Sequence, residues 1–433
     1  MAPAVVPLPY MKVKRLCLAI LIFFMLFSWA LPCAGAEGNA PAEQPSPLRF
    51  RPDGTFTVLI LSDAQDTQFV SPYLRNAISN ILYNYSVDLV VLLGNQLDGA
   101  NPVLRLGYGY NNVCTAIDRL LGPISDANIP FAVAFGSADY EAPAAVSLQA
   151  KQYRSYQNCV AVAENGACGI PVYTSDGETK AMHLYLFDTG FTDEEGRTGA
   201  ASPEQVDWYL AESESLRGEN DYQSIPSVAL MHAPVKEIYG LFDEVPSGTA
   251  DAFSGSGSAA GRYYSTVSDR ILAGEVREAP VTSDANNGLF DAFTRQKDVF
   301  LAVSGQEHLN SFIGSLHGID LAAAPGSTYT AYGEKADRGV RLFRFFEHNV
   351  QDYETLHVRF SDYDDGGGAE TLRYYLLTST GIRNTTKVGL IALVLLLVML
   401  VLVILILRQN ARQKQEDVVD EDRQLEEPED PYL

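Results

Sequence analysis

Five short loops in this sequence carry residue types that bind metal ions and transfer protons. They are Ser62–Gln65 (SDAQ), Gly94–Gln96 (GNQ), Gly136–Asp139 (GSAD), Met231–Pro234 (MHAP) and Gly305–His308 (GQEH). Four of the five directly follow an apolar run rich in β-branched residues. Asp, Asn and His side chains at such strand ends can hold metal ions that activate water for phosphate ester hydrolysis.

The order and spacing of these loops resemble those of the calcineurin-like metallophosphoesterases, close to the purple acid phosphatase branch. That family carries Asp-x-His, Gly-Asp, Gly-Asn-His-Asp/Glu, a lone His and Gly-His-x-His at the corresponding places. Residues 202–209 resemble a helix opening of this branch, and residues 226–234 resemble its lone-His strand. The match spans about residues 55–346.

The resemblance implies two metal sites in these loops, with most of the ligands replaced. Only Asp63, His232 and His308 keep the residue types of the family. Asn95 stands where a bridging aspartate belongs, and Ala138 replaces the histidine that donates a proton to the leaving group. The other substituted ligand positions are Gln65 and Gln306, which replace histidines, and Ser137, which replaces an asparagine.

The missing bridge argues most strongly against a dinuclear centre. Two dications roughly 3.5 Å apart repel by about 19 kcal/mol at an effective dielectric constant of roughly 20, and a neutral amide does not offset that repulsion. Loss of the proton donor costs a further factor of about 10² to 10⁴ in rate. We therefore expect no cofactor, or one weakly bound divalent cation.

A rearranged site of carboxylates is the alternative. Asp66, Asp98, Asp139 and Glu307 lie within a few residues of the vacated positions, and their oxygens would suit calcium or magnesium better than zinc. The competing interpretation is that these acids are solvated loop residues, with Asp66 and Asp139 capping nearby helices.

The elements that must position these loops alternate between strand and helix. An α/β fold of two packed sheets with helices outside follows from that alternation, and the resemblance sharpens it to a four-layer αββα sandwich. The later apolar runs alternate as in an antiparallel ladder. The expected core strands are 57–61, 89–93, 131–135, 184–187, 228–231 and 299–303, the helices 72–83, 113–128 and 203–216, and the later strands 312–316, 318–322, 340–346 and 354–360.

Both ends of the chain carry targeting signals. Basic residues, the apolar run 16–31 and Ala34-Gly35-Ala36 predict a signal peptide over residues 1–36, with an uncleaved anchor as the alternative. The uncharged run 388–407 is long enough for a transmembrane helix. Basic residues directly after it predict a cytoplasmic C-terminus and an extracytoplasmic globular domain.

The predicted organisation has a linker over 37–54, a phosphoesterase domain over 55–362, a juxtamembrane linker over 363–387 and an acidic, irregular tail over 408–433. Residues 234–298 form an insertion beside the lone-His loop that could act as a lid. Cys159 and Cys168 flank a short segment and could form a disulfide. The net charge of −23 disfavours nucleic acid as a partner.

We expect a membrane-anchored pseudo-phosphoesterase that binds an unidentified extracytoplasmic ligand or protein. An active phosphoesterase, working with one metal or with the carboxylate site, is the first alternative. A structural cell-surface element is the second.

Overall fold

The computed structural model describes residues 46–425 apart from 193–198, 334–336, 364–371, 374, 375 and 378. The predicted signal peptide, residues 37–45 of the predicted linker and the last eight residues of the tail lie outside the described residues. Contacts divide the chain into two units, Met1–Tyr374 and Tyr375–Leu433.

The first sheet has six strands, built on apolar runs that are buried on both faces. All five residues of the run LVVLL at 89–93 are buried, as expected for a central strand covered on both sides. Its first four strands along the chain pair in parallel, and the last two add antiparallel at one edge. The order is β17 (Glu354–Arg359), β16 (Gly339–Phe346), β2 (Thr55–Leu61), β3 (Leu89–Leu93), β4 (Phe131–Ala134) and β5 (Cys159–Ala163).

The second sheet has eight strands and holds the lone-His strand at its centre. Three neighbouring pairs at the centre are parallel, and antiparallel strands flank them. The order is β1 (Leu48–Arg49), β6 (Ala167–Tyr173), β7 (Lys180–Phe187), β8 (Ser227–Met231), β13 (Val299–Ser304), β15 (Ile319–Ala323), β14 (Ile313–Leu316) and β12 (Ile271–Ala273).

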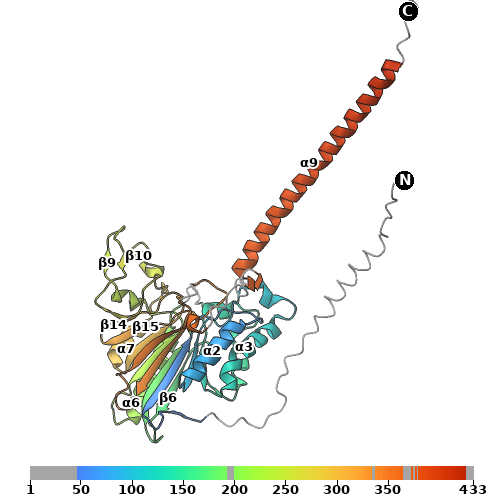
Figure 1. Cartoon of the computed structure of the whole chain (residues 1–433). Helices are drawn as coiled ribbons and strands as arrows, with labels where there is room; N and C mark the ends of the chain where they lie inside the picture. The colour runs from blue at the N-terminus through green and yellow to red at the C-terminus, as the bar shows by residue number, and fades with distance from the viewer. Residues whose placement is uncertain are drawn as a thin grey trace, which may run out of the picture. The chain divides into compact units, whose positions relative to one another are not determined.

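Helices cover the outer face of each sheet, so the predicted four-layer αββα sandwich is confirmed (Figure 1). Three apolar clusters fill the three spaces between the layers. Each helix buries residues three or four positions apart, which gives it one apolar face. The first sheet is covered by α2 (Pro72–Asn84), α3 (Gly109–Asp126) and α5 (Val146–Arg154), and the second by α6 (Pro203–Glu219) and α7 (Leu289–Gln296).

Local sequence sets where the site-proximal helices begin. Ser71 accepts hydrogen bonds from the backbone N–H groups of Tyr73 and Leu74, and Pro72 occupies the first helical position of α2. At α6, Ser202 is the N-cap and forms a capping box with Gln205, and Pro203 occupies the first turn. Shorter helices within the strand-end loops are η1 (Pro102–Arg105) and α4 (Ser137–Tyr140), and η4 (Phe360–Asp362) follows β17.

The first part of the insertion, residues 236–265, forms a small lobe (Figure 1), whereas β12 and α7 in its second part belong to the second sheet and its helical cover. Three short strands pair antiparallel in the lobe, and Tyr239, Phe242, Phe253 and Tyr264 pack their rings together at its base. Its elements are η2 (Lys236–Leu241), β9 (Glu244–Val245), β10 (Ala252–Ser254), η3 (Gly257–Ala259) and β11 (Tyr263–Ser265).

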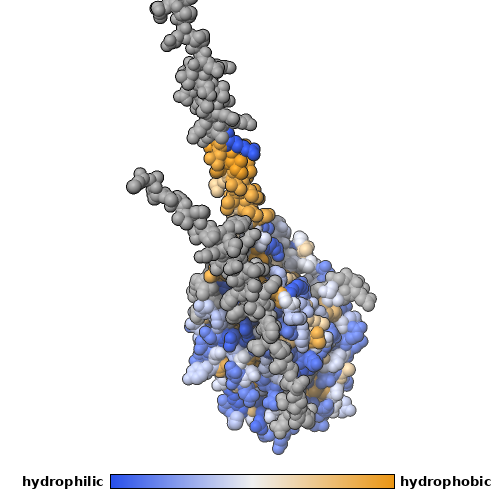
Figure 2. Space-filling model, turned by 90° about the vertical axis from the view of Figure 1, so that its right-hand side faces the viewer, coloured by the Kyte–Doolittle hydropathy of each residue, from blue (hydrophilic) through white to orange (hydrophobic). Residues whose placement is uncertain are grey.

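The second unit contains α9 (Ser379–Leu425). Within it, residues Ile382–Gln409 are long and apolar enough to cross a membrane, by length and composition. Figure 2 shows this apolar band against the largely hydrophilic surface of the globular unit. The helix continues to Leu425, whereas the sequence predicts an irregular tail from 408; the Gln, Glu and Arg residues of this stretch are good helix formers.

Candidate functional site

The backbone of the strand-end loops keeps an unusual conformation. Asp63 (φ 54°), Gln65 (φ 40°), Asn95 (φ 53°) and Gln306 (φ 74°), all predicted ligand positions, lie in the left-handed region. Residues with a side chain rarely adopt this conformation, and such residues concentrate at ligand sites. Each of these loops therefore retains a costly backbone geometry although its side chains have changed.

Asp63 is the hub of the site and is fully buried. Its Oδ1 accepts a hydrogen bond from the Asn95 amide at 3.0 Å, and its Oδ2 accepts from the Ser62 hydroxyl at 2.6 Å and the Gln306 backbone N–H at 2.9 Å. His308 Nε2 and His232 Nε2 lie 3.4 and 3.9 Å from Oδ1. The structure thus brings all three retained family residues together.

Both histidines are oriented by backbone carbonyls. Nδ1 of His232 lies 2.8 Å from the Leu93 carbonyl, and Nδ1 of His308 lies 2.6 Å from the Tyr332 carbonyl. Because a carbonyl only accepts, each Nδ1 carries the proton and Nε2 faces Asp63. A side chain at Gly94 would place Cβ 2.4 Å from His232 Nδ1, so this approach requires glycine.

The ionised form of Asp63 and the protonated form of His308 favour each other. Burial opposes ionisation of Asp63, but His232 and His308 outweigh burial and hold the pKa of this carboxyl well below its usual range. Burial also opposes protonation of His308, yet the Asp63 carboxylate raises the pKa of that imidazole. Asp63 therefore favours the protonated form of His308, and the imidazole Nε2 lies 3.4 Å from Asp63 Oδ1.

The donor set does not fit a dinuclear centre. Asn95 turns its N–H group toward Asp63, and its Oδ1 accepts the backbone N–H of Ala138 at 2.9 Å. A bridging ligand would have to present oxygen to both metals, and this amide is committed to protein partners instead. Across the described residues, no three or more His, Cys, Asp or Glu side chains form a group that could hold a metal ion.

The other substituted positions do not converge on Asp63. The Gln306 side chain donates to the Val281 carbonyl at 3.1 Å. Ser137 is exposed, and Ala138 contributes its backbone N–H to Asn95. Gln65 is half-buried, and its backbone carbonyl accepts from the Thr330 hydroxyl at 2.6 Å.

The four nearby acids are bound to protein partners. Asp66 accepts from the backbone N–H groups of Thr67 and Ser71, both at 2.8 Å, and Arg373 pairs with it at 2.8 Å. Asp139 accepts from the Gly136 and Leu97 backbone at 2.9 and 3.0 Å and completes the cap of α4. Glu307 accepts from the Val281 backbone, and the half-buried Asp98 accepts from the Asn101 amide at 2.8 Å.

Three of these acids bind protons more tightly in the folded state. Burial raises the pKa of Asp66 to about 6 and that of Asp139 to about 7, and it also raises the pKa of Glu307 well above its usual range. The folded protein therefore keeps the protons on these acids at pH values above about 4, where the unfolded chain releases them. Proton binding by the three acids stabilises the fold fully below about pH 4, and this contribution to the free energy of unfolding is lost as the pH rises through their raised pKa values.

An Asp139→Asn variant should show a smaller loss of stability between about pH 4.5 and 7.5 than the parent, because one proton-binding group is removed. The lost acceptor should cost roughly 1–3 kcal/mol at the lower pH. Urea unfolding at several pH values measures both effects. An equal fall in the free energy of unfolding for the two proteins would show that Asp139 does not titrate differently on folding.

A segment of the insertion, residues 275–283, lies across the last site loop; we call it the strap. Glu307 and Gln306 hold it through Val281, as described above. Asn310 Oδ1 accepts the backbone N–H of Arg277 at 2.9 Å, and the Leu309 N–H donates to Glu278 at 2.7 Å. Gln306, a family ligand position, therefore binds the strap.

Gln306→Ala should loosen the strap and cost about 1 kcal/mol of stability, because the side chain gives up one hydrogen bond. Faster amide hydrogen exchange over 277–283, and faster tryptic cleavage at Arg277, are the expected signs. Gln65→Ala is the matched control, since this glutamine stands at another ligand position and does not bind the strap. Unchanged exchange in the Gln306 variant would contradict the assigned role.

Tyr332 covers His308 from outside. The two rings stack at a centroid distance of 4.0 Å and an interplanar angle of 7°, and Tyr332 itself is half exposed. Its carbonyl also accepts the His308 Nδ1 proton. Tyr332 thus shields the Asp63–His308 pair from water, which strengthens their attraction.

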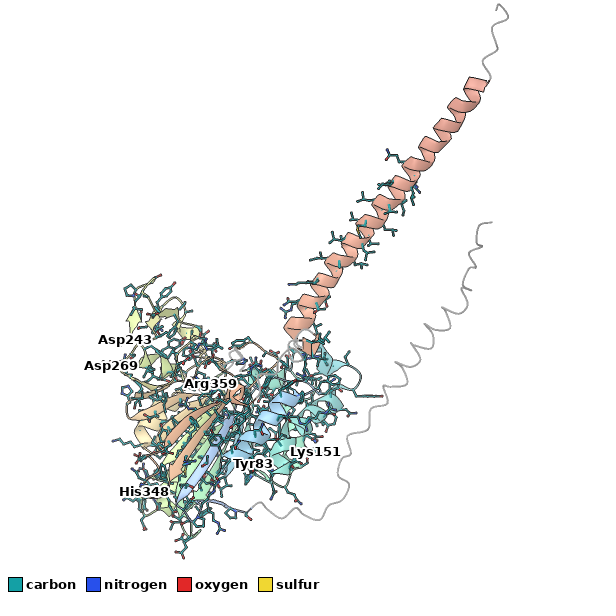
Figure 3. The ribbon with its side chains drawn as sticks, in the orientation of Figure 1. Tyr83, Lys151, Asp243, Asp269, His348 and Arg359 are labelled. Carbon is teal, nitrogen blue, oxygen red and sulfur yellow. The ribbon has the colours of Figure 1, made fainter. Side chains whose placement is uncertain are left out.

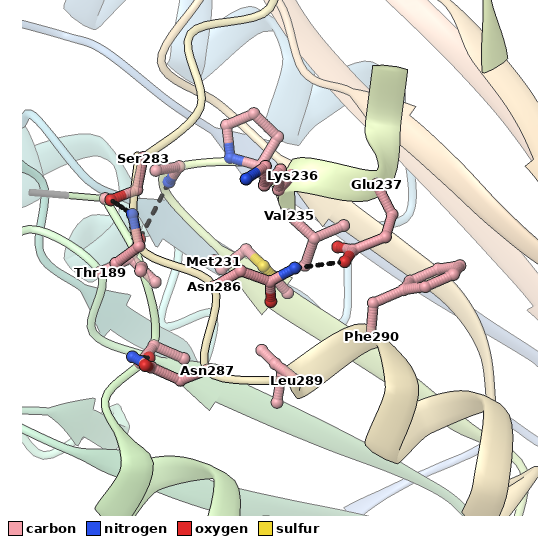
Figure 4. Close-up of a pocket in the computed structure, with 16 residues that line it drawn as sticks. Thr189, Met231, Val235, Lys236, Glu237, Ser283, Asn286, Asn287, Leu289 and Phe290 are labelled. Atoms are coloured by element: carbon pink, nitrogen blue, oxygen red, sulfur yellow. Dashed lines mark hydrogen bonds between the residues drawn. The ribbon is translucent and has the colours of Figure 1, made fainter. Parts of the chain in front are cut away.

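Behind the His232 loop, a pocket lies between the ends of β7 and β8 and the insertion (Figure 4). The Ala233 N–H donates to the Thr189 hydroxyl at 2.9 Å, and the Asn286 amide donates to Glu237 at 2.6 Å. The free space is about 30 Å³, the room of roughly one water molecule. This pocket is too small for a phosphate ester.

Sequence reasoning missed Ser62, Tyr332 and Arg373 as site residues. Ser62 follows a buried strand directly and precedes Asp63, a signal that could have found it. Tyr332 and Arg373 come from loops distant in sequence and carry no motif. The cysteines Cys159 and Cys168 are both free in the structure, so the suggested disulfide is not formed.

No protein-family model matches the chain. It is 22% identical over 332 residues to a protein of Arabidopsis thaliana described as probable inactive purple acid phosphatase 14, covering 66% of this chain and 74% of that protein. Probable inactive purple acid phosphatase 28 of the same plant is 23% identical over 320 residues, with the same coverage.

Among solved structures, a dimetal phosphatase from Danio rerio aligns with 70% of this chain and 98% of its own, at 12% identity and a TM-score of 0.41. The sequence relatives described as inactive support a pseudoenzyme interpretation of this branch. The resemblance of the chain to the calcineurin-like metallophosphoesterases, in their purple acid phosphatase-like branch, is thereby confirmed.

Proposed function

We propose that this chain is a membrane-anchored pseudo-phosphoesterase whose globular domain binds a ligand or protein on the extracytoplasmic side. The observation that carries the proposal is the internal closure of the site. Both carboxylate oxygens of Asp63 accept hydrogen bonds from the protein, from Asn95 and from Ser62, and His308 Nε2 lies 3.4 Å away. Gln306 and Glu307 are committed to the strap.

The membrane part of the proposal rests on the apolar helix and its flanks. The segment Ile382–Gln409 has the length and composition of a span. Arg408, Arg412 and Lys414 gather at its C-terminal end, and such clusters favour the cytoplasmic side. The globular domain is then extracytoplasmic.

The test compares phosphate release by the purified full chain in detergent with release by a His308→Ala variant, over a range of common phosphate esters and added metals. We expect both proteins to show the same background release and no dependence on metal. Metal-dependent release by the parent that disappears in the variant would overturn the pseudoenzyme proposal.

One observation favours a second candidate, an enzyme with a single metal. The Nε2 atoms of His232 and His308 face the same carboxylate oxygen, with no hydrogen-bond partner for either atom. Two imidazoles and one carboxylate are residue types that several transition metals accept, but these three would have to rearrange, because in the described residues they do not form a group that could hold an ion. Such an enzyme would still need a proton donor where Ala138 stands.

A further inference from the structure

Exposed apolar side chains gather on the loops that follow β2, β3 and β4. The loop between β3 and α3 carries Leu106 and Tyr108, and the first turn of α3 carries Tyr110, with exposed fractions of 64%, 73% and 39%. Phe69 in the β2 loop and Leu148 in the first turn of α5 are exposed to 47% and 42%. We call these five side chains, three aromatic and two leucine, the aromatic surface.

Hydrogen bonds and close packing hold the three loops together. The Gln68 amide donates to the Val103 carbonyl at 3.0 Å, which joins the β2 loop to the β3 loop. Arg105 donates to the carbonyls of Gly99 and Glu141, both at 2.6 Å, which joins the β3 loop to the β4 loop. The aromatic surface therefore rests on one rigid framework.

The framework is tied to the chain segment that leads into the apolar helix. Arg373 is largely buried and pairs with Asp66, three residues before Phe69. Asp66 in turn exchanges backbone hydrogen bonds with the β3 loop, through Gln96 and Asp98. Only eight residues, 374–381, separate Arg373 from Ile382, and such a stretch reaches at most roughly 30 Å.

The β3 part of the aromatic surface carries little charge, which suits a lipid surface. Residues 99–117 contain one arginine and no acidic residue, in a chain with 54 acidic residues and a net charge of −23. Anionic headgroups repel the acidic residues found elsewhere in this protein, and residues 99–117 have no acidic residue to be repelled. Tyrosine prefers the membrane–water interface, where its ring lies in an apolar layer and its hydroxyl stays hydrated.

We propose that the aromatic surface docks onto the outer leaflet of the bilayer that holds the apolar helix, with Leu106 and Tyr108 in the headgroup layer. The inference rests on the membrane anchoring proposed above. Docking would fix the orientation of the globular domain on the membrane.

The test places a fluorophore on the aromatic surface of the full chain in phosphatidylcholine vesicles, with and without lipid that carries a doxyl quencher. Tyr108→Trp and Leu106→Trp are the reporter variants. Tyr83→Trp is the matched control: Tyr83 is highly exposed and lies roughly 17 Å along α2 from its site-proximal end (Figure 3). Emission is compared with that of the parent, which contains Trp29 and Trp208.

We expect the doxyl lipid to remove about half of the added emission in both reporters and none in the control, because aromatic residues at the interface lie within reach of the quencher. Reporters that float with the vesicles but stay unquenched would overturn docking and leave anchoring intact. A blue shift without quenching would indicate a protein contact and would also overturn docking. A chain that fails to float would overturn both.

Discussion

Asn95→Asp is expected to destabilise the metal-free protein by about 3 kcal/mol at neutral pH and to make its stability depend on metal ions. The substitution replaces a donor 3.0 Å from Asp63 Oδ1 by a second buried carboxylate. The neutral donors around Asp63 do not offset the repulsion between two such carboxylates. A dication would, so metal present at about 100 times its dissociation constant should restore about 2.7 kcal/mol.

Urea unfolding of parent and variant, with chelator and with added zinc or manganese, measures this effect. Asn76→Asp is the control, since this exposed asparagine in α2 should change stability by no more than about 0.5 kcal/mol. If metal stabilised the parent as strongly as the variant, Asn95 would not be the residue that excludes it.

Asp63→Ala should cost roughly 3–5 kcal/mol, because several buried donors lose their common acceptor, at about 1–3 kcal/mol for each unsatisfied group. The Ser62 hydroxyl, the Asn95 amide and the Gln306 N–H all lose their acceptor. In the parent, Asp63 contributes to the free energy of unfolding only within a defined range of pH. It requires pH above the ordinary Asp pKa of about 4, and the part due to His308 is lost as pH rises through the raised pKa of that imidazole.

The free energy of unfolding of Asp63→Ala, measured from about pH 5 to 9, tests both the size and the window. Asp243→Ala removes an acid from an exposed ion pair with Arg270 and should cost no more than about 1 kcal/mol (Figure 3). A loss for Asp63→Ala as small as that of the control would mean that Asp63 is not the hub of the site.

The sequence predicted the layers because the core strands are continuous apolar runs bounded by Gly, Ser, Asp or His. It did not predict β5, β6 or α7. The β6 run ACGIPVY contains glycine and proline and is only partly buried, so it lacks a clean periodic signal.

The later strands were expected as one antiparallel ladder, yet β14 and β15 join the second sheet while β16 and β17 join the first. Local pattern does not encode which sheet a hairpin joins.

At the site, the family resemblance implied that Asp63, His232 and His308 lie at two neighbouring metal positions, and the structure brings the three together. What the sequence could not indicate is the direction of each side chain. The amide of Asn95 turns its N–H group toward Asp63, and Gln306 turns to the strap. Both choices depend on partners distant in sequence, Ala138 for Asn95 and Val281 for Gln306, and Val281 carries no motif.

The most direct test of the central claim is the metal content of the purified full chain in detergent, by elemental analysis and by calorimetric titration with zinc, manganese, magnesium and calcium. We predict no tightly bound metal, or at most one weakly bound cation, because the Asn95 amide at the bridging position is bound to Asp63 and Ala138. Two tightly bound transition-metal ions per chain would contradict it.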